Sequence, residues 1–118
     1  MNIELHDKAV AAAERFLERK DYEILAKSFE TSLGTTIDIV AQDEDTICFI
    51  DVTAVNHSEG GFADGHTERS AWEIMAASWL ASNPPEGDVS VRFDKCDMIV
   101  VSDDRALLRY HSNVLSEG

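Results

Sequence analysis

The sequence predicts one α/β domain over residues 1–118, with a mixed central sheet covered by helices. Three short segments rich in β-branched residues lie between two segments whose apolar residues recur at helical spacing. The central strand-like segments are largely apolar on both faces, which favours helices on both sides of a sheet over a half-exposed meander. A chain of 118 residues is long enough to bury one core of this kind. The predicted order of elements is αβββαββ.

Two amphipathic helices are predicted. The first covers residues 7–20, with Asp7 as its N-cap and apolar positions at Ala9, Ala12, Ala13, Phe16 and Leu17. The second covers residues 67–81 and is ended by the two prolines at positions 84 and 85. Its predicted apolar stripe consists of Ala71, Ile74, Met75, Ser78 and Trp79. Each helix can therefore pack one face against a sheet.

Five strands are predicted from length and β-branched content, at residues 22–29, 37–41, 47–54, 89–101 and 106–110. The acidic segment QDED joins the second and third strands as a hairpin. Residues 56–64 are predicted to form a loop, because turn-prone side chains there accompany a glycine pair.

The hairpin is predicted to set two aspartates opposite each other. A two-residue turn at Glu44 and Asp45, or a four-residue turn with the same centre, pairs Asp38 directly with Asp51. The same register pairs Thr36 with Thr53, Val40 with Phe49 and Gln42 with Ile47 on that face. The other face is predicted to carry Ile37, Ile39, Ala41, Cys48, Ile50 and Val52.

Two interpretations of this acidic pair are open. Opposed residues on antiparallel strands have Cβ atoms roughly 4.5–5.5 Å apart, so two carboxylates there repel unless they share a proton or a cation. A metal site would use Asp38, Asp51, the backbone carbonyl of Val52 and water, a set of hard oxygen ligands that suits Mg²⁺ or Mn²⁺. In the alternative, either aspartate lies near a strand end, reaches solvent or caps a helix, and has no chemical role.

The histidines and cysteines carry weaker signals. His57 and His66 flank the predicted loop, and either add to the acidic pair or are simply exposed. Cys48 and Cys96 stand singly in apolar segments, a pattern typical of buried reduced thiols. Both tryptophans of the second helix are predicted to fill the core rather than to stack on bases.

The charge balance limits the choice of partners. The chain has 23 Asp and Glu against 10 Lys and Arg, a net charge of −13. Phosphate binding depends on clustered cations, so this acidic chain disfavours a nucleic-acid partner unless a local basic patch exists. No basic start with an apolar run indicates a signal peptide, and no apolar stretch approaches membrane-spanning length. We therefore expect a cytoplasmic protein without membrane contact.

Several segments resemble the YraN-like family of uncharacterised bacterial proteins, whose fold is similar to that of restriction endonucleases and related Mg²⁺-dependent nucleases. These are ERFLERKDYEILAKSF, GTTIDIVA in place of the family's GEIDLIA, CFIDVTA in place of FVEVKxR, the helix end MAASWLA, and VRFD. The resemblance covers nearly the whole chain and implies a single restriction-endonuclease-like α/β/α sandwich. In that fold the acids of the two hairpin strands hold the metal, and they correspond to Asp38 and Asp51.

Two positions depart from the family pattern. The glutamate before the first aspartate is Thr36, and the lysine two residues after the second acid is Thr53. In the nuclease mechanism that the resemblance implies, this lysine orients the attacking water and offsets charge on the phosphate, and losing such a donor typically costs about 10²–10³ in rate. Arg69 is the first candidate for a substitute cation and Arg92 the second, although a surface or packing ion pair is the commoner role for each.

Two functions are therefore in competition. The resemblance implies a nuclease-like, nucleic-acid-processing protein with a degenerate active site, weak or inactive, and if active a Mg²⁺-dependent phosphodiester hydrolase. The charge instead favours a non-catalytic acidic interaction module on the same fold. Such a module would contact a basic protein, or self-associate as a homodimer, through the loop around Gly60 and Gly61.

Overall fold

The order of elements agrees with the sequence prediction. The computed structural model describes residues 3–31, 34–56, 69–102 and 105–114. Its elements are α1 (Ile3–Arg19), β1 (Glu23–Glu30), β2 (Thr36–Asp43), β3 (Thr46–Asn56), α2 (Arg69–Ser82), β4 (Ser90–Ser102) and β5 (Arg105–His111). The predicted succession αβββαββ is thus confirmed.

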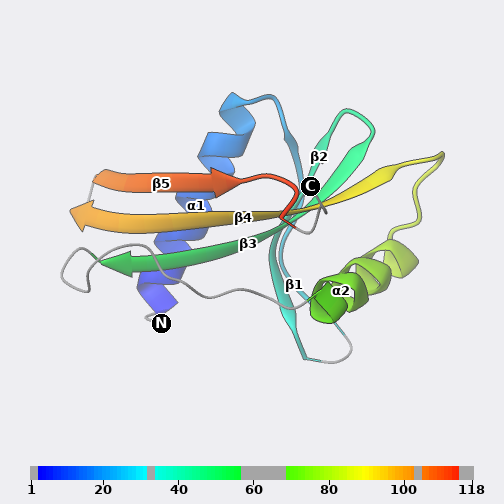
Figure 1. The fold of residues 1–118 in the computed structure, drawn as a ribbon, viewed down its shortest axis with the longest axis horizontal. Helices are drawn as coiled ribbons and strands as arrows, with labels where there is room; N and C mark the ends of the chain where they lie inside the picture. Colours follow the sequence, from blue (N-terminus) through cyan, green and yellow to red (C-terminus); the bar gives the residue numbers. More distant parts are fainter. Residues whose placement is uncertain (1–2, 32–33, 57–68, 103–104, 115–118) are drawn as a thin grey trace.

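The strands form one mixed sheet in the order β1-β2-β3-β4-β5. Neighbouring strands are antiparallel except β3 and β4, which run parallel. Parallel neighbours need a crossover connection, and α2 lies in the connection between these two strands. The two helices cover opposite faces of the sheet, α1 behind it and α2 in front in Figure 1. A mixed sheet with helices on both faces is the predicted fold class, and it is consistent with a restriction-endonuclease-like fold.

Each face of the sheet has its own hydrophobic core. The α1-side core contains Leu17 and Ala13 of the helix together with Ile39, Ala41, Cys48, Ile50, Val52, Ala54, Cys96 and Met98 of the strands. The α2-side core contains Ile37, Val40, Ile47 and Phe49 of the strands together with Trp72, Met75, Ala76 and Trp79 of the helix. The two-sided burial predicted for the hairpin strands is therefore confirmed, and both tryptophans fill the core.

The α2-side core covers only part of the sheet. Its partly buried members come from β1, from α2, from the start of β4 and from the segment before β4. Among the described residues it includes none of β5. Figure 1 shows α2 beside the ends of β1 and β2, while β4 and β5 extend away from it. The end of β3 and its neighbours on that face are therefore outside this hydrophobic core.

Two details of the helices differ from prediction. The first helix begins at Ile3, so Asp7 lies inside it and is not its N-cap. The reason is that Leu5 extends the apolar stripe and packs against the α1-side core one turn before Ala9. In α2 the buried residues are Trp72, Met75, Ala76 and Trp79, and Ile74 is 45% exposed. The predicted stripe was therefore rotated by part of a turn.

The hairpin turn is placed as predicted. Asp43 pairs with Thr46 around the two-residue turn, and the predicted register continues to the pair of Ile39 with Ile50. Glu44 has a positive φ of 55°, as a tight hairpin turn requires of at least one central residue. The register beyond Ile39 differs, and this difference shapes the candidate site.

Candidate functional site

Asp38 lies where the regular alternation of β2 breaks. Ile37 packs into the α2-side core and Ile39 into the α1-side core, although residues two apart on a regular strand share a face. The neighbouring strand β1 is irregular at the same level, because Ser28, between the partners of Ile37 and Ile39, has a φ of 53°. The prediction that Ile37 shares a face with Ile39 is therefore wrong. This local twist turns Asp38 away from the face that strict alternation would give it.

The Asp38 carboxylate is held by two groups. Its Oδ2 accepts a hydrogen bond of 2.8 Å from the backbone amide of Val52, the residue after Asp51. Its Oδ1 lies 3.0 Å from Nε2 of His6, on the first turns of α1. Asp38 is only 6% exposed, so these contacts replace most of its water. The first predicted acid is thus buried against α1 and against the backbone beside the second acid.

Asp51 projects toward the other side of the sheet. Because β3 pairs with β4 in unbroken register, its side chains alternate regularly, and Asp51 falls in the same row as Ile47 and Phe49 of the α2-side core. Strand pairing brings the two acids to neighbouring positions, but the ladder ends at Ile39 and Ile50, so the predicted direct pair on one face is not formed. What links Asp38 to Asp51 is the amide of Val52.

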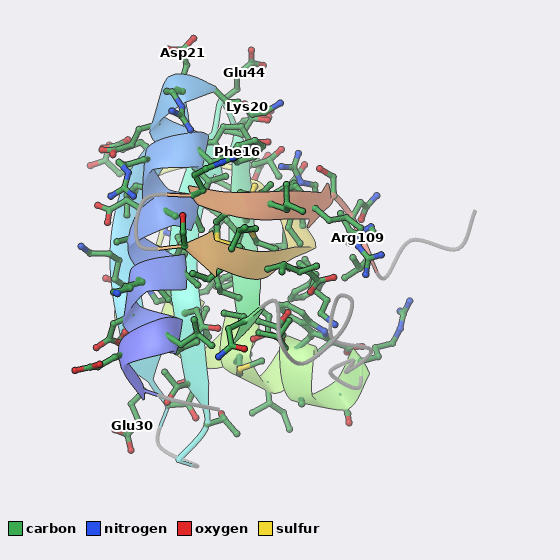
Figure 2. All side chains as sticks on the ribbon, turned by 90° about the vertical axis from the view of Figure 1, so that its left-hand side faces the viewer. Phe16, Lys20, Asp21, Glu30, Glu44 and Arg109 are labelled. Atoms are coloured by element: carbon green, nitrogen blue, oxygen red, sulfur yellow. The ribbon has the colours of Figure 1, made fainter. Side chains whose placement is uncertain are left out.

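Thr53, the position of the family's lysine, belongs to a polar cluster around Asp97. Its hydroxyl donates a hydrogen bond of 2.6 Å to Oδ1 of Asp97, which is 2% exposed. The other oxygen of Asp97 lies 3.1 Å from a guanidinium nitrogen of Arg109 and 3.7 Å from Nε2 of His111. Figure 2 shows Arg109 projecting from β5 on the side away from α1. A buried carboxylate therefore gathers cationic side chains next to Thr53.

Lys95 is a cation of this site that the sequence did not reveal. It is the direct neighbour of Asp51 across the parallel pair of β3 and β4, and its Nζ lies 3.8 Å from Oδ1 of Asp97. Lys95 and Asp97 of β4 lie on the same face of the sheet as their β3 partners, Asp51 and Thr53, because paired residues share a face. The alternation in the segment KCD could have suggested that Lys95 and Asp97 share a face, but not which neighbour they meet.

The two predicted substitute cations are placed differently. Arg69 is exposed and is the first described residue of α2. Arg92 lies on the face of the sheet that α1 covers. Its Nε donates to both oxygens of Asp94, at 3.0 and 3.2 Å, and its Nη2 donates to Tyr22 Oη at 2.7 Å. These contacts raise the pKa of Arg92, chiefly through the hydrogen bonds that it donates to Asp94. Arg92 is therefore committed to a structural ion pair and is separated from Asp51 by the sheet.

The buried thiols have no part in the site. Cys48 and Cys96 are both free and buried, as predicted. Burial raises the pKa of each thiol to about 12, because it penalises the thiolate. Neither group is therefore set up as a nucleophile or a metal ligand at neutral pH.

The fit of the site to a metal ion is partial. Within residues 3–31, 34–56, 69–102 and 105–114, no group of three or more His, Cys, Asp or Glu is arranged to hold one. The available donors are Asp38, Asp51 and the carbonyl of Val52, and each oxygen of Asp38 keeps a second lone pair besides the one used above. His57 and His66, which the sequence suggested as further ligands, lie outside the described residues. A cation here would need water for most of its coordination sphere, as Mg²⁺ commonly does.

No helix in the described part of the chain is long and apolar enough to cross a membrane.

Comparison with known proteins identifies relatives that match most of the chain, including the β2–β3 hairpin. A family model described as Uncharacterised protein family UPF0102 matches residues 11–101. The UPF0102 protein of Rhodopseudomonas palustris strain BisB5 is 40% identical over 88 residues, 73% of this chain and 66% of the relative. UPF0102 protein RPA0323 of R. palustris strain ATCC BAA-98 / CGA009 is 36% identical over 87 residues, with the same coverage.

A relative from another genus is covered more completely. The UPF0102 protein of Francisella tularensis subsp. novicida strain U112 is 34% identical over 95 residues, 78% of this chain and 81% of the relative. The chain spans just under two thirds of the Rhodopseudomonas proteins, at 66% of their length. By the family model and by these identities, the chain belongs to Uncharacterised protein family UPF0102, which is the YraN-like family that its motifs resemble.

Proposed function

We propose that this chain is a nucleic-acid-processing protein of the nuclease type whose active site is degenerate, so that it hydrolyses phosphodiester bonds weakly or not at all. The observation that carries the proposal is the hydrogen bond from the Val52 amide to Asp38 Oδ2. It joins the first acid to the peptide that directly follows the second acid. A hard divalent cation takes carboxylate and backbone carbonyl oxygens as ligands, and Asp38, Asp51 and the Val52 carbonyl supply oxygens of this kind near that peptide.

The cation would be Mg²⁺ or Mn²⁺. Asp38, Asp51 and the Val52 carbonyl would hold it, and the metal would act as a Lewis acid that activates water and neutralises charge on a phosphate. Occupation would use the second lone pair of an Asp38 oxygen, and His6 is the side chain that already lies beside Oδ1.

Two features favour weak hydrolysis. The hydroxyl of Thr53 is neutral and is already committed to Asp97, so it cannot replace a lysine that offsets charge on a phosphate. Lys95 is the side chain next to Asp51 that could supply such charge, but it shares Asp97 with Arg109. We assign Lys95, ahead of Arg69 and Arg92, as the cation that would act on a phosphate at Asp51.

Metal binding tests the proposal. If about 5 mM Mn²⁺ is 100 times the dissociation constant of the site, binding would add roughly 2.7 kcal/mol to the free energy of unfolding. We expect the unfolding temperature of the parent to rise with Mn²⁺, and the rise to be lost in Asp51→Asn and reduced in Asp38→Asn. The measurement is thermal unfolding at constant ionic strength, with cleavage of a labelled oligonucleotide as a second readout.

The matched control is Asp88→Asn. Asp88 is exposed and lies in the segment between α2 and β4, and this change removes the same single charge as Asp51→Asn. A Mn²⁺ response that is unchanged in Asp88→Asn but absent in Asp51→Asn supports the site. Equal responses in all variants would refute it.

The net charge of −13 supports a second candidate function, a non-catalytic acidic module that binds a basic protein or a second copy of the chain. This function requires neither the metal nor Lys95. It is favoured if Mn²⁺ has no effect on the parent, and size-exclusion chromatography with light scattering then separates self-association from a monomer that needs another protein.

A further inference from the structure

A groove of about 480 Å³ runs between α1 and the outer strands β4 and β5. Four cationic side chains line it, and none of the described residues that line it is acidic: Lys8, Arg15, Arg19 and Arg105. In a chain with only 10 Lys and Arg and 23 Asp and Glu, this is a strong local inversion of charge. We call it the α1–β5 groove.

The inversion arises from the way charge is divided around α1. Lys8, Arg15 and Arg19 recur at spacings of seven and four residues, which places them on one side of a helix. Glu14 and Glu18 instead line a separate hollow beside β1. The helix therefore presents Lys8, Arg15 and Arg19 to the groove beside β5, while Glu14 and Glu18 lie toward the opposite edge of the sheet.

The guanidinium groups of the groove are not neutralised by any residue that the structure describes. Among residues 3–31, 34–56, 69–102 and 105–114, neither Arg15, Arg19 nor Arg105 forms an ion pair. Other basic residues of the fold do have acidic partners, for example Lys27 with Glu14 at 3.0 Å. The charge of these three arginines is thus available to an anion from outside.

The length of the cationic row indicates a chain of anions. From Lys8 to Arg19 is eleven residues of α-helix, or about 16 Å at 1.5 Å per residue. Successive cationic residues along this row are separated by one to two helical turns, and Arg105 lies across the groove from them on β5. A single phosphate would engage one end of such a row, whereas a row of phosphates engages all of it.

The floor of the groove is apolar. Ala12 and Phe16 of α1 form it together with Met98 and Leu108 of the sheet. Phe16 lies between α1 and β5 (Figure 2), with its ring centroid 5.4 Å from that of Tyr110. A cationic rim over an aliphatic and aromatic floor suits a single strand of nucleic acid. Its phosphates would contact the Lys and Arg side chains, and its nucleobases would rest on the apolar side chains.

We infer that the α1–β5 groove binds a stretch of single-stranded nucleic acid. This inference rests on the proposed function and adds to it the form of the nucleic acid and the surface that holds it. Paired bases in a duplex are stacked on one another and cannot rest on the floor of the groove. The groove and the candidate metal site share one helix, since His6 contacts Asp38 only two residues before Lys8 enters the groove.

The test measures binding of a fluorescein-labelled oligothymidylate by anisotropy, without metal and at several salt concentrations. Each phosphate contact to a single strand contributes roughly −0.7 to the slope of log K against log salt. We expect Arg15→Gln with Arg19→Gln to weaken binding at least about tenfold at low salt and to reduce the magnitude of the slope by about 1.4. The matched single changes are Arg15→Gln and Lys27→Gln, and only the first should weaken binding.

A second pair of variants tests the floor of the groove. Ala12→Glu places a carboxylate among the four cations, while Ala12→Gln adds nearly the same volume without charge. We expect Ala12→Glu to abolish binding and Ala12→Gln to retain most of it. Unfolding temperatures of all variants establish that each is folded.

The outcomes separate this inference from the proposed function. Equal effects of Arg15→Gln and Lys27→Gln on binding would overturn the groove as a single-strand site. Affinities for heparin and for duplex DNA equal to that for the oligothymidylate would also overturn it. The Mn²⁺ response of Asp51→Asn is measured independently, so loss of that response with groove-dependent binding intact would refute the metal site and leave the groove standing.

Discussion

Individual buried carboxylates of this protein differ in what holds them, and Asp94 is the most completely satisfied. It is fully buried, at 0% exposure. Its oxygens accept hydrogen bonds from Arg92, from the Tyr110 hydroxyl at 2.6 Å and from the backbone amide of Asn113 at 2.8 Å. Burial and the neighbouring carboxylate raise the pKa of Tyr110, so that its hydroxyl remains a donor. The VRFD segment thus joins β4 to β5 and, through Arg92, to Tyr22 before β1.

Replacing Asp94 should therefore be costly. Asp94→Ala leaves the partly buried Arg92 with only its longer contact of 3.6 Å to Asp43, and breaking a buried pair in this way typically costs about 3–5 kcal/mol. We expect the urea midpoint to fall accordingly, measured by circular dichroism. Double replacement with Arg92→Met should recover part of the loss, because the unpaired charge is then absent. A single-variant loss below about 1 kcal/mol would contradict the importance of this ion pair.

At the scale of elements, the β2–β3 turn keeps a residue in an unfavourable conformation. Glu44 has a φ of 55° and Asp45, at the second central position, does not have a positive φ. Only Gly adopts positive φ without penalty, and other residues there cost roughly 1–2 kcal/mol. The hydrogen bond of 2.8 Å from Gln42 Nε2 to the Glu44 carbonyl helps to hold the turn.

Glu44→Gly is expected to stabilise the protein by roughly 1 kcal/mol, because Glu44 is exposed and its side chain contributes no buried packing. Thermal and urea unfolding measure the change. Asp45→Gly removes the same charge from the same turn but gains nothing from positive φ, so it should be neutral or destabilising. If both variants shift stability equally, charge and not backbone conformation controls the turn.

The elements also show how far sequence patterns reach. The turn centre and the register from Asp43 to Ile39 followed from turn length and alternation, because both are local. The position of Asp38 did not, because the twist at Ser28 and Ile37 depends on packing against two different cores. His6 and Lys95 were missed for a related reason, since each meets its acid through tertiary contact and not through a motif.

At the scale of the whole molecule, charge is distributed unevenly over a strongly acidic protein. The net charge is −13, while β5 contains two arginines, one histidine and no acid. The cationic side chains of the Asp97 cluster and of the α1–β5 groove belong to the outer part of the sheet and to the side of α1 that faces it. A nucleic acid would therefore meet a repulsive surface except on approach to this edge.

This imbalance predicts that salt stabilises the folded state. Repulsion among uncompensated carboxylates extends over about 10 Å at 0.1 M salt and about 30 Å at 0.01 M, so added salt weakens it. We expect the unfolding temperature to rise by a few degrees between about 0.01 and 0.2 M NaCl, since roughly 1 kcal/mol corresponds to about 4 °C for a domain of this size. Differential scanning calorimetry measures this directly.

A fall in unfolding temperature over that range would mean that ion pairs such as Arg92 with Asp94 outweigh the general repulsion. The same effect sets the conditions of the metal experiment, because MnCl₂ screens charge as NaCl does. Stabilisation by Mn²⁺ therefore counts as binding only where it exceeds that of NaCl at equal ionic strength and depends on Asp51. Screening acts on Asp88→Asn and Asp51→Asn alike, whereas an ion between β2 and β3 would lose a ligand in Asp51→Asn and none in Asp88→Asn.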